Sequence, residues 1–178
     1  MSYQKINCND RSMAHAYNIF VESPGPHQRF KTRDGWSEIL VPGDFTHSGK
    51  EDGICHIVSS LAFQRGSSQL CVKVLYAVSM DSTTCFRVNA SMESIFELYD
   101  YEELLLPDYI VFDDSADWGV YSYGNEFGYT AVGGCNEFMR EVVTALGGLD
   151  KLRSDFAEYE GVDDRILRAA RASCKWPT

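Results

Sequence analysis

Residues 107–146, PDYIVFDDSADWGVYSYGNEFGYTAVGGCNEFMREVVTAL, constrain the fold more than any other stretch because three structural signals follow one another there. Residues 109–112 form a short apolar run rich in aromatic and β-branched side chains, which is typical of a strand. Residues 118–132 have the pattern of a hairpin, and apolar side chains recur with helical spacing after residue 136. These signals predict a packed unit of strand, hairpin and helix.

The hairpin pattern also predicts a register. Gly124 and Asn125 tolerate the positive φ angles of a two-residue turn, so the turn is expected there and Val120 should pair with Tyr129. Alternation along the strands assigns a core face to Trp118, Val120, Phe127, Tyr129 and Ala131. The opposite, exposed face is assigned to Tyr121, Tyr123, Glu126 and Thr130. A slip of one residue would exchange the two faces.

The helix after the hairpin is bounded by recognisable signals. Gly133-Gly134 is expected to break the second strand, and Asn136 is a suitable N-cap. Gly147-Gly148 is expected to stop the helix, because glycine adopts the left-handed conformation found after many helix ends. Between these limits, Phe138, Met139, Val142, Val143 and Leu146 form one apolar stripe.

The rest of the chain is richer in strands first and in helices last. Strands are predicted at 36–41, 70–78 and 83–88, and helices near 9–20, at 91–98 with Ser91 as the cap, from 149 to about 160 and from 163 onward. Residues 54–63 fit either a short helix or a strand. This order predicts the α+β class, as a single domain of residues 1–178. The sheet should be mostly antiparallel, with a central hairpin and helices concentrated in the C-terminal third.

Composition narrows the cellular setting. The N-terminus is polar, and no apolar run approaches the roughly 18 residues that a membrane-spanning helix needs. We therefore expect a cytoplasmic protein that does not enter a membrane. Dispersed cysteines in such a protein are usually buried thiols rather than disulfides or metal ligands. This expectation covers Cys8, Cys55, Cys71, Cys85, Cys135 and Cys174.

Charge is unevenly placed along the chain. The formal net charge is −10, and residues 93–139 contain eleven acidic residues and no Lys or Arg. Such a field repels nucleic acid and anionic membrane and speeds association with a basic partner. The alternative is a solvated acidic face that only keeps the protein in solution, and the sequence leaves both readings open.

Two clusters are candidates for catalysis or metal binding. Cys55 and His56, with Asp52 and His47 nearby, form the best candidate for a thiol nucleophile, although their spacing matches no zinc signature. Asp113, Asp114 and Asp117 follow a strand, where carboxylates can hold magnesium, but the pattern is not that of an EF-hand. An ordinary turn explains the acidic cluster as well. No phosphate-binding, dinucleotide-binding or hydrolase motif occurs, so no metal or cofactor is expected.

The central stretch resembles a family of known function. A strand ending in Asp-Asp-Ser, then Asp-Trp-Gly-Val-Tyr, a tight turn, a second strand, Gly-Gly and a helix opening with Glu-Phe-Met is similar to small bacterial immunity proteins. These proteins neutralise toxins delivered by contact-dependent or type VI secretion systems, and the resemblance covers roughly a quarter of the chain. It implies a protein that binds one cognate toxin, often a nuclease, and covers its active site.

The leading hypothesis is therefore a non-enzymatic inhibitor of a basic toxin. Acidic residues would raise its association rate, while outward tyrosines would slow dissociation. The predicted contact residues are Asp113, Asp114, Asp117, Tyr121, Tyr123 and Glu126. The alternatives are a small enzyme that uses Cys55/His56 or Asp113/Asp114, and an adaptor subunit of a larger assembly. The acidic face could instead pair within the chain, with Arg165, Arg168 and Arg171.

Overall fold

The computed structural model describes residues 3–7, 16, 18–25, 28–31, 33–43, 53–75, 84–101, 108–122 and 129–158. The strands are β1 Tyr3–Asn7, β2 Phe20–Gly25, β3 Gln28–Phe30, β4 Trp36–Pro42, β5 Gln69–Leu75, β6 Thr84–Asn89, β7 Asp108–Phe112, β8 Trp118–Ser122 and β9 Tyr129–Cys135. The helices are α2 Ile54–Gln64, α3 Met92–Tyr101, α4 Asn136–Ala145 and α5 Leu149–Glu158. The ambiguous stretch at 54–63 is thus a helix. No described helix has the length and apolar character needed to cross a bilayer.

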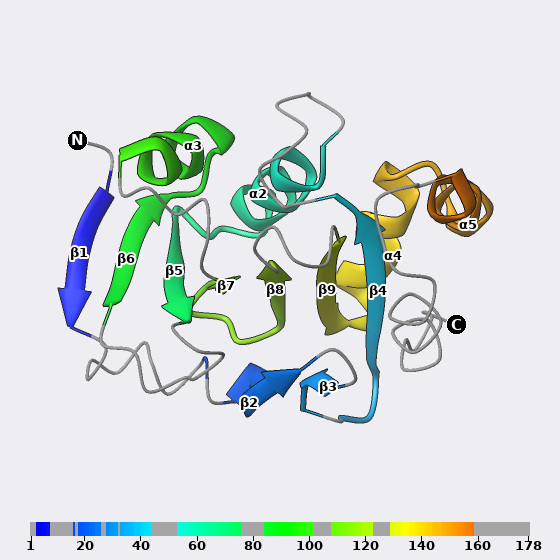
Figure 1. Ribbon diagram of the computed structural model, residues 1–178, viewed down its shortest axis with the longest axis horizontal. Coiled ribbons are helices and arrows are strands. Elements are labelled where there is room, and N and C mark those ends of the chain that lie inside the picture. The colour runs from blue at the N-terminus through cyan, green and yellow to red at the C-terminus, as the bar shows by residue number, and fades with distance from the viewer. Residues whose placement is uncertain are drawn as a thin grey trace.

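A seven-stranded sheet organises the fold (Figure 1). Its order is β1-β6-β5-β7-β8-β9-β4, and every neighbouring pair is antiparallel. β2 and β3 form a separate two-stranded sheet. The predicted α+β class and largely antiparallel sheet are confirmed.

Both faces of the large sheet are covered. In Figure 1, α2 and α3 lie on the upper side of the sheet and the β2–β3 pair lies below it. Alternation along β5 sends Leu70, Val72 and Val74 into the core on the helix side, and Cys71 and Leu75 into a second core on the β2–β3 side. Because each face is buried, all five residues of β8 are buried.

Aromatic contacts and one ion pair attach the small sheet to the large one. The Phe20 ring lies 5.2 Å from that of Phe30 and 6.3 Å from that of Phe112 in β7, measured between centroids. Arg29 of β3 is fully buried and forms an ion pair with Glu38 of β4. Phe20 is the first residue of β2, so the prediction that it belongs to a helix is wrong.

The predicted hairpin register is wrong. Val120 pairs with Val132 instead of Tyr129, and Ser122 pairs with Thr130, so the register is shifted by three residues. An odd shift exchanges faces, which places Tyr129 in the core on the β2–β3 side, away from Val120. The two-residue turn predicted at Gly124-Asn125 lies outside the described residues. Tyr123, Glu126 and Phe127 lie outside the described residues.

The register follows from the strand on the far side of β9. β4 pairs with β9 along seven residues, from Trp36 opposite Cys135 to Pro42 opposite Tyr129. This pairing also carries β9 straight through Gly133 and Gly134, where the sequence had suggested a break. A Cβ on Gly133 would lie 2.9 Å from Cγ of Phe30, so glycine is needed there for close packing rather than for strand termination.

The structure confirms two of the three predicted helix boundaries and corrects the third. Ser91 Oγ accepts a hydrogen bond from the Ser94 N–H at 3.2 Å, which confirms it as the cap of α3. Gly147 and Gly148 have φ angles of 89° and 94° and follow α4, which confirms the predicted stop. The prediction of Asn136 as the N-cap of α4 is wrong: Cys135 holds that position and Asn136 is the first helical residue. The Asn136 Oδ1 accepts a hydrogen bond from the Ser37 hydroxyl of β4.

Candidate functional site: the β7–β8 turn and the α2–α3 groove

The turn between β7 and β8, residues 113–117, contains three of the predicted contact residues. Asp113 is only 2% exposed and accepts hydrogen bonds from Trp118 Nε1 at 2.9 Å and from the Ser115 N–H at 2.9 Å. The hydroxyls of Ser67 and Ser115 also donate to it. The expectation that Asp113 lies on an exposed contact surface is therefore wrong, because its carboxylate is used to hold the turn.

Asp114 and Asp117, in contrast, present their side chains outward from this fixed backbone. The Asp114 side chain is 62% exposed, and its Oδ1 lies 3.6 Å from Nη2 of Arg87. The carbonyl of Asp117 accepts a 2.8 Å hydrogen bond from the Cys135 N–H, which ties the turn to the end of β9. Ala116 between them has a φ of 58°, a left-handed conformation that reverses the chain sharply.

Tyr121 is not an outward-facing residue. It is fully buried in the core on the β2–β3 side, and its hydroxyl donates a 2.7 Å hydrogen bond to Oδ2 of Asp108. The sequence prediction assumed one solvated face, but the small sheet covers that face. Of the six predicted contact residues, Asp114 and Asp117 are exposed, Asp113 and Tyr121 are buried, and Tyr123 and Glu126 lie outside the described residues.

Arginines from the first half of the chain partly balance the acidic stretch. Besides the Arg87–Asp114 pair, Arg33 donates to the Ala116 carbonyl at 3.4 Å. Arg65 donates to Glu141 Oε1 at 3.0 Å, and this hydrogen bond raises the Arg65 pKa. Arg65 Nη2 also lies 3.8 Å from Glu137 Oε1, so Asp114 and Glu137 of the acidic stretch each have an arginine beside them. The basic segment that begins at residue 165 lies outside the described residues.

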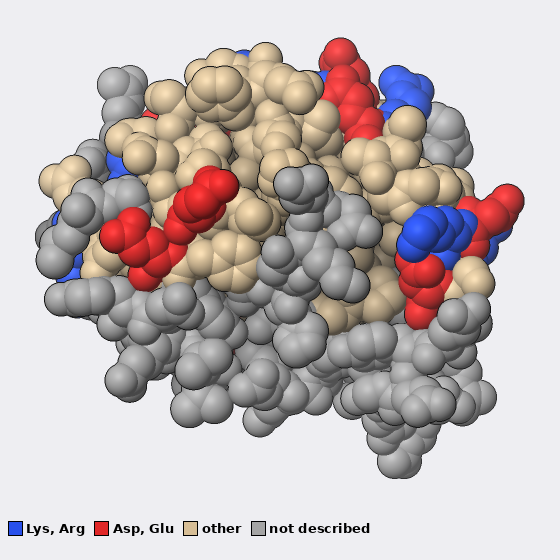
Figure 2. Space-filling view, turned by 90° about the horizontal axis from the view of Figure 1, so that it is seen from above, with Lys and Arg blue, Asp and Glu red and all other residues tan. Residues whose placement is uncertain are grey.

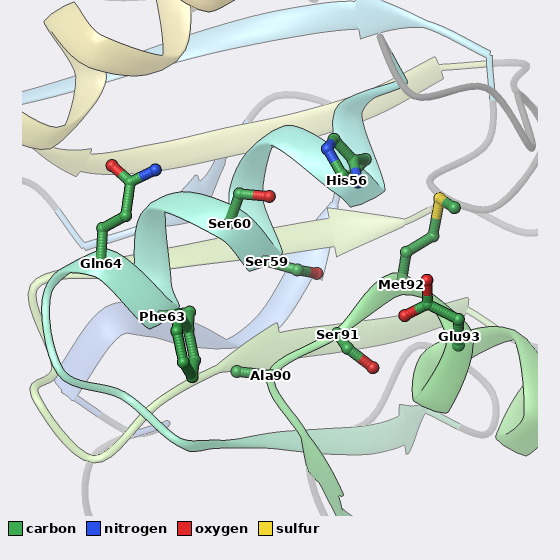
Figure 3. A pocket seen from close by; sticks show the side chains of 9 residues that line it. All are labelled: His56, Ser59, Ser60, Phe63, Gln64, Ala90, Ser91, Met92 and Glu93. Carbon is green, nitrogen blue, oxygen red and sulfur yellow. The ribbon is translucent and has the colours of Figure 1, made fainter.

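A groove lies between α2 and the start of α3 (Figure 3). It is an open hollow of about 250 Å³ lined by His56, Ser59, Ser60, Phe63, Gln64, Ala90, Ser91, Met92 and Glu93. In Figure 3 the side chains of α2 and those of the β6–α3 connection approach it from opposite sides. Phe63 is 65% exposed, and no other large hydrophobic side chain of the described ranges is exposed.

The structure separates the two residues of the proposed thiol cluster. Cys55 is 1% exposed and packs in the core on the helix side, whereas His56 is half-buried and lines the groove. Successive side chains on a helix diverge by about 100°, so this pair cannot act together as nucleophile and base. His47 and Asp52 lie outside the described residues.

The described residues offer few groups for metal or thiol chemistry. Within those ranges, no three side chains from His, Cys, Asp or Glu come close enough together to hold a metal ion. Burial raises the pKa of the Cys71 thiol to about 11, so it is protonated at neutral pH and is a weak nucleophile.

Sequence reasoning missed Phe63 because it left the type of element open. Once residues 54–64 are known to be helical, Ile54, Val58 and Leu61 fall on the stripe that faces the core, and Phe63 lies off that stripe. An aromatic residue outside the buried stripe of a helix was the signal that could have found the groove.

Searches against protein-family models, curated proteins and solved structures each find no match.

Proposed function

We propose that this chain is a cytoplasmic binding protein of the immunity type, which inhibits a basic protein toxin by covering its active site. The observation that carries the proposal is the presentation of the Asp114 and Asp117 carboxylates on a turn that the buried Asp113 holds in place. The formal net charge of −10 acts in the same direction, because it draws cationic proteins toward the surface.

A rigid turn favours binding for a physical reason. Ordering a loop on association costs free energy, and a loop that is already ordered avoids much of that cost. The hydrogen bonds to Asp113 order the backbone of the turn in the free protein. The two neighbouring carboxylates can then meet cationic side chains of a partner without a change in the turn.

The ion pair between Arg87 and Asp114 does not prevent such binding. Its atoms are 3.6 Å apart and the Asp114 side chain is 62% exposed, so it belongs to the exposed pairs that contribute about 0–1 kcal/mol. A cationic side chain of a partner can therefore replace Arg87 at small cost.

The test uses the purified chain and the toxin domain encoded by a gene next to its own. The wild-type chain should bind this domain and abolish its activity. The double variant Asp114→Asn/Asp117→Asn should associate roughly ten-fold more slowly at low salt, with a weaker dependence on ionic strength, as measured by stopped-flow fluorescence.

A matched control removes the same charge elsewhere. Asp150 and Asp155 on α5 take part in exposed pairs with Arg153 and Lys151. The variant Asp150→Asn/Asp155→Asn should associate at nearly the wild-type rate. Equal rates for the two double variants would show that the turn is not the contact surface, and active toxin in the presence of excess wild-type chain would refute inhibition.

A further inference from the structure

The groove between α2 and α3 combines an apolar wall with an acidic rim. Phe63 of α2 and Met92 at the start of α3 both supply apolar surface; in Figure 3 the Phe63 ring lies beside Ala90, and Met92 lies nearer His56. Glu93 is exposed at the start of α3, and Glu97 lies one helical turn further along the same side. None of the described residues that line the groove is Lys or Arg.

The acidic rim is charged and is oriented by local contacts. Hydrogen bonds from its own backbone N–H and from Ser91 lower the pKa of Glu93, with a smaller effect from His56, so the carboxylate is ionised at neutral pH. Arg65, at the C-terminal end of α2, directs its guanidinium to Glu141 and over the Phe138 ring on α4. Figure 2, which views the helix side, shows acidic atoms over α3 at its left and largely uncharged surface beside them.

The size of the groove limits its occupant. At about 250 Å³ it is smaller than the roughly 300–1,000 Å³ of pockets that enclose whole small molecules. It suits a few side chains of a larger partner. An exposed aromatic ring is the kind of apolar surface on which such side chains pack, and aromatic residues are enriched among binding hot spots.

We propose that this groove docks an extended segment of a partner protein in which a Lys or Arg lies two residues from an aliphatic residue, so that both side chains leave the segment on the same face. The aliphatic side chain packs against the Phe63 ring beside Ala90, and the cation pairs with Glu93 near Met92. The Ser60 hydroxyl lies on the same wall and is available to the segment's main chain. Acidic side chains at the rim disfavour nucleic acid and anionic lipid, which leaves a basic protein segment as the occupant. The inference goes beyond the proposed function, since it holds whether or not the partner is a toxin.

The test is a ¹H–¹⁵N NMR titration of the full chain with the blocked peptide Ac-Gly-Lys-Gly-Leu-Gly-NH₂, in which Lys and Leu share one face of an extended backbone. Resonances of α2 and of the β6–α3 connection should shift together, and those of α5 should not. Replacing Lys by Glu in the peptide should weaken binding about two- to five-fold, as for an exposed ion pair. Replacing Leu by Ser should weaken it roughly ten-fold.

Variants of the protein test the same two contacts. Phe63→Ser should weaken peptide binding roughly ten-fold, and its spectrum should remain that of a folded chain because the ring is 65% exposed. Glu93→Gln should weaken binding about two- to five-fold, while Asp150→Asn on α5 removes a charge without effect.

Three results would overturn the proposal. One is the absence of shifts in α2 and α3 at millimolar peptide. Another is equal binding of the Lys and Glu peptides. The third is a shift of the same resonances by a single-stranded oligonucleotide or by phosphatidylglycerol vesicles but not by the peptide.

Discussion

The indole Nε1 of Trp118 donates a 2.9 Å hydrogen bond to Oδ2 of Asp113, and both residues are buried. The Trp118 ring also stacks on Phe138 of α4, with centroids 5.3 Å apart and an interplanar angle of 15°. One side chain thus connects the β7–β8 turn, the sheet and a covering helix. Asp113 therefore has a structural role, and its neighbours Asp114 and Asp117 depend on it for their placement.

Removal of the Asp113 carboxylate should destabilise the protein strongly. Asp113→Ala leaves the Trp118 indole N–H and the Ser115 N–H without their acceptor, and an unsatisfied buried donor costs about 1–3 kcal/mol. We expect a loss of about 3 kcal/mol in the free energy of unfolding, measured by urea denaturation. Asp114→Asn is the matched control and should change it by less than about 1 kcal/mol. Equal stability of the two variants would contradict the buried role of Asp113.

Substitutions at Tyr121 distinguish a core residue from a contact residue. Tyr121→Phe removes the hydrogen bond to Asp108 and should cost about 1 kcal/mol of stability. Tyr121→Ala should cost about 3–5 kcal/mol, because it empties a fully buried site. Thermal unfolding measures both. A Tyr121→Ala protein with an unchanged melting temperature would restore the earlier prediction that this side chain faces outward.

Phe20 and Ile19 pack so closely against Gly119 of β8 that an added methyl group at this position should destabilise the protein. A Cβ at Gly119 would lie 2.5 Å from Cζ of Phe20 and 2.8 Å from Cγ2 of Ile19. Gly119→Ala should therefore lower the free energy of unfolding by about 1–3 kcal/mol. Adding Phe20→Leu removes the nearest atom, so the double variant should be more stable than additivity predicts. Strict additivity in calorimetry would argue against this contact.

Cys71 should make stability depend on alkaline pH. Burial raises its thiol pKa from 9.0 to about 11, with Arg87 opposing the shift, so the folded chain holds this proton more tightly than the unfolded chain. The resulting stability is fully present below about pH 9 and is lost as the pH rises through about 11.

The measurement compares the wild-type chain with Cys71→Ala. The free energy of unfolding of the wild-type chain minus that of Cys71→Ala should fall by about 2–3 kcal/mol at most between pH 8 and pH 11. It falls because the wild-type chain loses the stability that its protonated thiol provides. Groups common to both proteins cancel in this comparison. A difference that stays constant over the range would show that Cys71 is not desolvated.

Several features could be predicted from the sequence because they depend on near neighbours. Ser91 caps α3 through an N–H three residues away, and Gly147 and Gly148 stop α4 through their own backbone freedom. β7 ends at Phe112, where the apolar run meets Asp113. The alternation of strand-like and helix-like periods likewise indicated the α+β class.

Other features were decided by contacts between distant parts of the chain. Leu40 pairs with Ala131, and the β4–β9 ladder to which they belong sets the register that local turn chemistry predicted wrongly. Phe20 and its layer bury the face that was expected to be solvated, and so Tyr121 lies in a core. Amphipathic side chains such as tyrosine are found both on solvated faces and on buried faces of antiparallel sheets. The local sequence of such a strand therefore does not show whether one or both of its faces are covered. Only the packing of a second layer determines which case holds, because burial is a property of the assembled surfaces.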